Sequence, residues 1–187
     1  MKRQVVMRPG WALLLLAVVL LGSWPRVRAA VDRFERGRPT VHAGDLLVAR
    51  PGGVGQIFAG TVILMLAFDD ARRMGVVVNR ARAHPWVRYR WGGPVPGEIP
   101  ITVVQARSRP PGATPLGHDL YWLEGDLDWA EGAVRQRVYA GYAGWAPGQL
   151  EEEIRRGAWS VRPARPGLVF GDDGEDTWLV ALGETLR

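Results

Sequence analysis

The side chains best suited to metal chemistry are scattered along this chain. His42, His84 and His118 are far apart, and none has a histidine partner three or four residues away. A metal site needs ligands that converge, so this spacing favours isolated histidines. The chain has no cysteine, which excludes disulfides, thiolate metal sites and thiol nucleophiles. The sequence therefore predicts no metal site and no cofactor.

Three alternating acids could form a calcium loop. They are Glu124, Asp126 and Asp128, but the remaining ligands of an EF-hand do not follow at the required spacing. We interpret this stretch as a solvated turn.

A glycine-rich segment, Pro51-Gly52-Gly53-Val54-Gly55, could suggest a phosphate loop. No Lys-Ser or Lys-Thr pair follows it, so a turn between strands is the better interpretation.

Nucleophilic catalysis is also poorly supported. Ser108 and Ser160 are the serines that follow residue 29, and neither occupies a Gly-x-Ser-x-Gly elbow. We expect no catalytic residues and no enzyme. A hydrolase stays open as an alternative only if Asp69, Asp70 and His84 converge in one cleft.

The better candidate is a binding surface near the middle of the chain. Arg80 could hold an anionic group, and neighbouring loop glycines would permit close approach of a partner's backbone. We expect a ligand or partner surface formed by Asn79, Arg80, Trp91, Gly92, Gly93 and Pro94. The alternative is that these residues only shape the turns of the fold. The cations and rings of 86–91 could stack on nucleic-acid bases, but anchoring of the tryptophans in a core is favoured.

The first 29 residues have the layout of an export signal. Lys2, Arg3 and Arg8 precede an apolar run over 11–21, and Val27-Arg28-Ala29 offers a cleavage site. This run is shorter than the roughly 20 residues that span a bilayer. We therefore expect 1–29 to be a signal peptide and the protein to reach the periplasm or cell envelope. Arginines at 26 and 28 leave an uncleaved membrane anchor open, because positive charge is disfavoured on the exported side.

The N-terminal segment also accounts for the basic charge of the chain. The sequence has 24 basic and 19 acidic side chains, a net charge of +5 and a pI near 10.4. The whole excess lies within 1–29, so 30–187 is formally neutral. The basic pI is therefore no argument for nucleic-acid binding, and we expect none from the mature domain.

Apolar runs and turn residues define the elements of the remaining chain. Residues 30–44 are polar and aperiodic, as in a tether, and 45–187 form one domain. Strands are expected at 45–50, 61–68, 74–79, 101–105, 118–123, 137–144, 159–161 and 168–170, with loops at 81–93 and 107–117. Helices are expected at 128–136, 147–157 and 176–186. This pattern predicts an α+β fold, mostly antiparallel.

One long segment and several short ones form a pattern of motifs. The long segment runs from Tyr139 to Trp159 and contains Trp145-Ala-Pro-Gly-Gln-Leu-Glu. The short ones, in order, are Gly44–Pro51, Met74–Arg80, Gly92–Val95 and a tryptophan at 178. Together they resemble the YqgE/AlgH family of bacterial proteins. The resemblance covers about 44–185 and implies a single α+β domain with a curved, barrel-like sheet. It implies no established catalytic activity, and members are often labelled transcriptional regulators.

The chain departs from the family pattern at three places. It has Gly55-Gln-Ile-Phe58 where the family has Asp-Pro-x-Phe, and Leu66–Asp69 where a Cys-Glu-His-like segment is usual. Only 81–91 stands where a leucine-rich helix normally lies. Most relatives also lack an export signal. We therefore expect an exported, non-enzymatic binding or regulatory module with an unknown protein or small-ligand partner. The alternative is a transcriptional regulator, which would require a cytoplasmic location.

Overall fold

A computed structural model of the chain describes residues 40–81, 89–126, 130 and 132–183. Residues from Thr40 onward form one compact unit. The expected signal peptide, most of the expected tether, His84, Trp86 and Asp128 lie outside the described residues. Within the expected tether, Val41 is buried among the residues that pack under the first sheet.

The first sheet contains five antiparallel strands in the order β10-β1-β2-β3-β9. Its central strands are apolar on both faces because both faces are covered, as the burial of β2 shows. β2 and β3 form the expected hairpin. The bounds are β1 Asp45–Ala49, β2 Val62–Phe68, β3 Arg73–Val77, β9 Ala143–Gly144 and β10 Trp159–Pro163.

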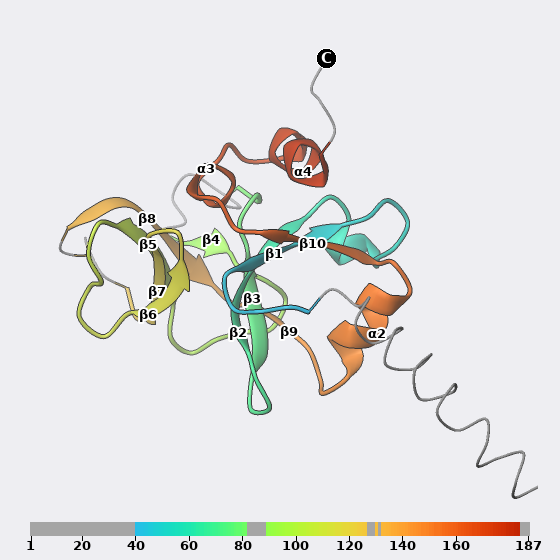
Figure 1. Cartoon of the computed structure of the whole chain (residues 1–187), viewed down its shortest axis with the longest axis horizontal. Coiled ribbons are helices and arrows are strands. Elements are labelled where there is room, and N and C mark those ends of the chain that lie inside the picture. Colours follow the sequence, from blue (N-terminus) through green and yellow to red (C-terminus); the bar gives the residue numbers. More distant parts are fainter. Residues whose placement is uncertain (1–39, 82–88, 127–129, 131, 184–187) are drawn as a thin grey trace, which may run out of the picture. The chain divides into compact units, whose positions relative to one another are not determined.

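The second sheet has the order β4-β8-β5-β7-β6. All its pairings are antiparallel except β4 with β8, which run parallel. The bounds are β4 Arg90–Trp91, β5 Ile101–Ala106, β6 Thr114–Gly117, β7 Leu120–Glu124 and β8 Ala133–Ala140. The described strands lie in these two sheets and do not close into a barrel (Figure 1).

Short helices cover both faces of the first sheet. α3 (Pro166–Val169) and α4 (Glu175–Leu182) lie on one side, and α2 (Gln149–Arg155) lies on the other (Figure 1). A single 3-10 turn, η1 (Gln56–Phe58), precedes β2. Across the described residues, no helix has both the length and the apolar character needed to cross a bilayer.

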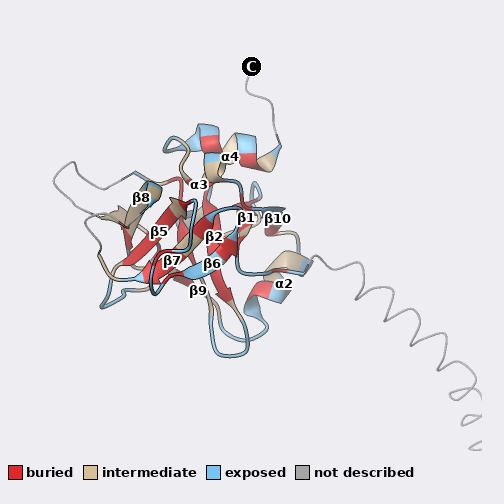
Figure 2. Ribbon diagram, turned by 60° about the vertical axis from the view of Figure 1, so that its left-hand side comes forward, coloured by how far each residue is buried: buried red, intermediate tan, exposed pale blue. Residues whose placement is uncertain are grey.

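The hydrophobic core has one cluster on each face of the first sheet. The larger cluster joins both sheets to α3 and α4, and it includes Leu46, Leu64, Val103 and Trp122. A second cluster on the opposite face packs Leu47 and Ile63 beneath α2. Both appear as the red inner strands of Figure 2. At about 25 cal/mol per Å² of apolar area, this burial is the main stabilising contribution to the fold.

The α+β class and the mostly antiparallel sheets are confirmed, but some expected elements are wrong. The expected helix at 128–136 conflicts with β8, which begins at Ala133 and pairs with β5. The expected strand at 168–170 is largely α3, which Pro166 starts at its first turn. The loops expected at 81–93 and 107–117 contain the short strands β4 and β6. β4 forms because it pairs with β8, far along the chain, whereas β6 pairs with the adjacent β7 in a hairpin.

Candidate functional site

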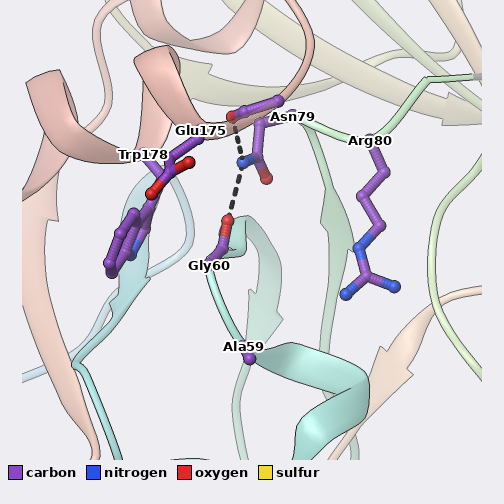
Figure 3. A pocket seen from close by; sticks show the side chains of 7 residues that line it. Ala59, Gly60, Asn79, Arg80, Glu175 and Trp178 are labelled. Atoms are coloured by element: carbon purple, nitrogen blue, oxygen red, sulfur yellow. Dashed lines mark hydrogen bonds between the residues drawn. The ribbon is translucent and has the colours of Figure 1, made fainter.

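A pocket of about 410 Å³ lies at the end of β3, where three segments meet. The turn after η1 contributes one wall, the residues after β3 form the floor, and the start of α4 forms the opposite wall (Figure 3). Its lining residues are Ala59, Gly60, Asn79, Arg80, Gly174, Glu175 and Trp178. The pocket therefore contains two of the six residues expected at a partner surface, Asn79 and Arg80.

Asn79 forms the floor and holds the three segments together. Its side chain is 2% exposed. The side-chain oxygen accepts the Val62 N–H at 2.8 Å, and Nδ2 donates to the carbonyls of Gly60 and Gly174, each at 2.9 Å. The Gly174 N–H donates in return to the Asn79 carbonyl at 2.7 Å. The amide of Asn79 therefore builds the pocket, and its hydrogen-bonding groups are already engaged.

Arg80 and Trp91 are brought together beside this floor. The guanidinium carbon of Arg80 lies 4.8 Å from the centre of the Trp91 ring, within cation–π range. Its Nη2 donates to the Ile57 carbonyl at 2.7 Å. These two contacts fix the direction of a half-buried cation, whose remaining N–H groups can still take an anionic group.

The opposite wall carries a negative charge and a second indole. Glu175 is exposed in the first turn of α4, where its carboxylate is stabilised by the helix dipole. The indole N–H of Trp178 donates to the Ala49 carbonyl at 2.6 Å, which anchors α4 to β1. Figure 3 shows Glu175 beside the Trp178 ring, with Arg80 on the far side of Asn79. A carboxylate and a guanidinium thus flank one pocket.

Gly92 and Gly93 are buried and lie away from this pocket, between the two sheets. The Gly92 N–H donates to Ala140 of β8 at 2.8 Å, and its carbonyl accepts from Val77 of β3 at 2.9 Å. A Cβ on Gly93 would lie 2.2 Å from the carbonyl carbon of Tyr142. The two glycines are therefore explained by close packing of backbones. Pro94, which follows them, is exposed.

Comparison with known proteins shows which family has this sequence pattern. A family model described as AlgH-like matches residues 46–185. The chain belongs to the AlgH-like family. A Streptomyces avermitilis relative, named as a UPF0301 protein, is 33% identical over 166 residues, which cover 74% of this chain and 84% of the relative. A UPF0301 protein of Methylococcus capsulatus is 31% identical over 170 residues, covering 77% and 93%. The function of this family is not established.

Solved AlgH-like structures share the fold. A crystal structure of a Corynebacterium diphtheriae protein superimposes with a TM-score of 0.66 and 27% identity, covering 80% of this chain and 90% of that one. The solution structure of AlgH from Pseudomonas aeruginosa gives a TM-score of 0.61 at 24% identity, with 78% and 89% covered. At that identity, the second match supports the fold alone.

In this AlgH-like domain, two further arginines fix the loop between α3 and α4. Arg137 donates to the carbonyls of Val78, Val169 and Gly171 at 3.2, 3.1 and 2.6 Å. Arg90 forms an ion pair with Asp173. These contacts tie the second sheet to the loop that leads into α4, and so they hold the Glu175 wall in position.

Asp69 and Asp70, the carboxylates of the hydrolase alternative, lie in the β2–β3 turn. Asp69 accepts the N–H groups of Arg72 and Ala71 at 2.7 and 2.8 Å. These backbone bonds lower the pKa of Asp69, since they favour its charged form. Asp70 is exposed beside it, and His84 lies outside the described residues. Within the described ranges, no three His, Asp or Glu side chains gather as a metal site.

Sequence reasoning missed Glu175 and Trp178 as pocket residues. Both lie in or next to a helix expected at 176–186, and an acid in the first turn is ordinary helix chemistry. The sequence gives no sign that this turn faces Asn79, which lies 95 residues earlier than Gly174. Homologous sequences in which these positions vary together could have supplied that signal.

Proposed function

We propose that this AlgH-like chain is an exported, non-enzymatic binding module of the cell envelope. Its partner is a protein or a small ligand, taken at the pocket that contains Arg80. Export is supported by the charged, apolar and cleavage segments of 1–29. The neutral charge of 30–187 favours a partner other than nucleic acid.

One observation carries the binding role. The Arg80 guanidinium is held against Trp91 at 4.8 Å on one side of the pocket, and the Glu175 carboxylate stands on the other. Opposite charges on two walls suit a partner that presents an acidic and a basic group together. Asn79 and Trp178 are committed to the fold through their hydrogen bonds, so Arg80 and Glu175 are the groups available for recognition.

Crosslinking in intact cells tests the site. Arg80→Ala should reduce capture of the partner at least about tenfold, because the charge-assisted hydrogen bond to the partner is lost. Glu175→Gln should reduce it as well. Arg135→Ala is the matched control, since Arg135 is an exposed arginine on β8, outside the pocket. Equal capture by wild type and Arg80→Ala, with both proteins folded, would refute this placement.

The compartment is tested separately. An alkaline-phosphatase fusion after residue 40 should be active, because that enzyme needs export for its disulfides. A fusion that lacks residues 1–29 is the control and should be inactive. An inactive full fusion would refute export and favour the cytoplasmic regulator instead.

A further inference from the structure

A second pocket lies at the opposite end of β3. It has a volume of about 340 Å³ and is bordered by the β2–β3 turn, by Val95 and by the chain around β9. Its lining residues are Ala71, Arg72, Arg73, Met74, Val95, Tyr142, Gly144, Trp145 and Ala146. Four of these belong to the Tyr139–Trp159 segment, the longest motif of the family resemblance.

Arg73 is the exceptional side chain in this pocket. Its side chain is 13% exposed, and its guanidinium carbon lies 5.5 Å from the centre of the Phe68 ring. Nε lies 3.5 Å from a carboxylate oxygen of Glu151. Nε is buried, and the Arg73 side chain donates no hydrogen bond to any described residue. The Glu151 carboxylate at 3.5 Å compensates this charge only in part, so the other N–H groups of the guanidinium can take an oxyanion.

Arg137 of the same domain is used differently. It donates to three backbone carbonyls and thereby holds the fold together. Arg73 lacks any such bond, although its own carbonyl accepts the Trp145 N–H at 3.0 Å. Its backbone is thus fixed against the motif segment while its side-chain donors stay available.

Aromatic side chains complete the pocket. A Cβ on Gly144 would lie 3.1 Å from the Tyr142 ring and 3.8 Å from Val95, so the ring lies directly over this glycine. The indole N–H of Trp145 is bound to Glu153 at 3.0 Å, and the ring therefore offers the pocket an apolar surface. The lining thus combines a cation with two aromatic rings, which suits a flat acid.

We propose that this pocket binds a carboxylate attached to a flat apolar group. Arg73 donates to the carboxylate in a two-point contact, for which a guanidinium is well shaped. Tyr142 and Trp145 contact the apolar group. The carboxylate belongs either to a small free acid or to the C-terminal residue of a peptide.

The local charges favour a monoanion. Arg72 lies 3.8 Å from Glu124, and Arg73 lies 3.5 Å from Glu151, so two cations face two acids. A dianionic phosphate would add two negative charges to a balanced site, whereas a carboxylate adds one. The proposal is independent of the Arg80 pocket, because the two sites share no lining residue.

Amide NMR titration of the full chain with benzoate tests this site. Benzoate should shift the signals of residues 142–146 and saturate, whereas neutral benzamide should bind at least about tenfold more weakly, since it lacks the charge. N-acetylphenylalanine serves as the probe for a peptide terminus. Tighter binding than benzoate indicates a chain end, and weaker binding indicates a small acid. Absence of saturable binding by either acid would overturn the proposal.

Two variants locate the contact. Arg73→Gln should weaken benzoate binding at least about tenfold, and Arg135→Gln, on an exposed part of β8, should leave it unchanged. Glu151→Gln should strengthen binding a few-fold, because the competing carboxylate loses its charge. This second variant decides the matter if Arg73→Gln does not fold. Unchanged binding in Glu151→Gln, or in a folded Arg73→Gln, would refute the role of Arg73.

Discussion

The carboxylate of Glu153 accepts the indole N–H of Trp159 at 2.8 Å, and the same oxygen accepts the indole N–H of Trp145 at 3.0 Å. Its other oxygen accepts from Gln149 at 3.0 Å. Gln149 precedes Glu153 by four residues on the same face of α2, and Trp145 approaches from the segment just before the helix. Trp159 returns to the same carboxylate after α2 ends. The spacing of Trp145, Glu153 and Trp159 in the Tyr139–Trp159 segment is thus explained by one carboxylate that accepts hydrogen bonds from both indoles.

Replacement of Glu153 should destabilise the domain strongly. Glu153→Ala leaves two indole N–H groups without their acceptor, and Trp159, which is 4% exposed, has little access to water. We expect the free energy of unfolding to fall by about 3 kcal/mol in urea titrations. Glu152→Ala is the neighbouring control, because Glu152 binds the exposed Arg155 and should cost a small fraction of that. Equal losses of unfolding free energy in both variants would contradict a stabilising role for the bonds between Glu153 and the two indoles.

The backbone contact between the sheets gives a second prediction. Gly93→Ala would place a Cβ 2.2 Å from the Tyr142 carbonyl carbon, at a φ of 153° that side chains rarely adopt. We expect it to lower the free energy of unfolding by about 3 kcal/mol or more. Gly55→Ala is the control, since its Cβ would meet nothing within 4 Å. If Gly93 served only a partner surface, the two variants would be equally stable in thermal unfolding.

The sequence was informative wherever a pattern depends on neighbouring residues. The apolar run at 61–68 indicated β2, and the acids and Gly157 around 147–157 indicated α2. The prediction of a helix at 128–136 is wrong. Pairing of Ile101 with Tyr139 and Val104 with Gln136 across the second sheet makes β8 instead. Such pairings outweigh weak local preferences, and they cannot be read from one sequence.

The candidate site also depends on contacts between residues that are far apart in the sequence. Asn79 and Arg80 were expected as surface residues, but the burial of Asn79 depends on Gly174, far along the chain. The sequence predicts Trp91, Gly92 and Gly93 at one surface. In the structure, the Trp91 ring contacts Arg80, while the two glycines face the backbone of 141–142. Residues 91–93 are consecutive in the sequence, but they contact different parts of the fold.

Tyr139 gives a prediction for alkaline pH. Its side chain is fully buried between the sheets, and its hydroxyl lies near the Arg137 side chain without forming a hydrogen bond of good geometry. Burial raises the pKa of the Tyr139 hydroxyl, and the positive charges of Arg137 and Arg90 oppose this only in part. The folded state therefore keeps its proton at a pH where the unfolded tyrosine, with a pKa near 10, has lost it.

The sign follows from the protons bound by each state. Above about pH 10 the unfolded chain binds fewer protons than the folded chain, so stability falls as pH rises. Tyr139→Phe should remove this contribution and give a flatter alkaline limb in urea unfolding. At pH 7 the variant should be as stable as wild type or slightly more stable, because the lost hydroxyl made no hydrogen bond of good geometry. Parallel alkaline limbs, or a clear loss at pH 7, would show that the hydroxyl is hydrogen-bonded in solution.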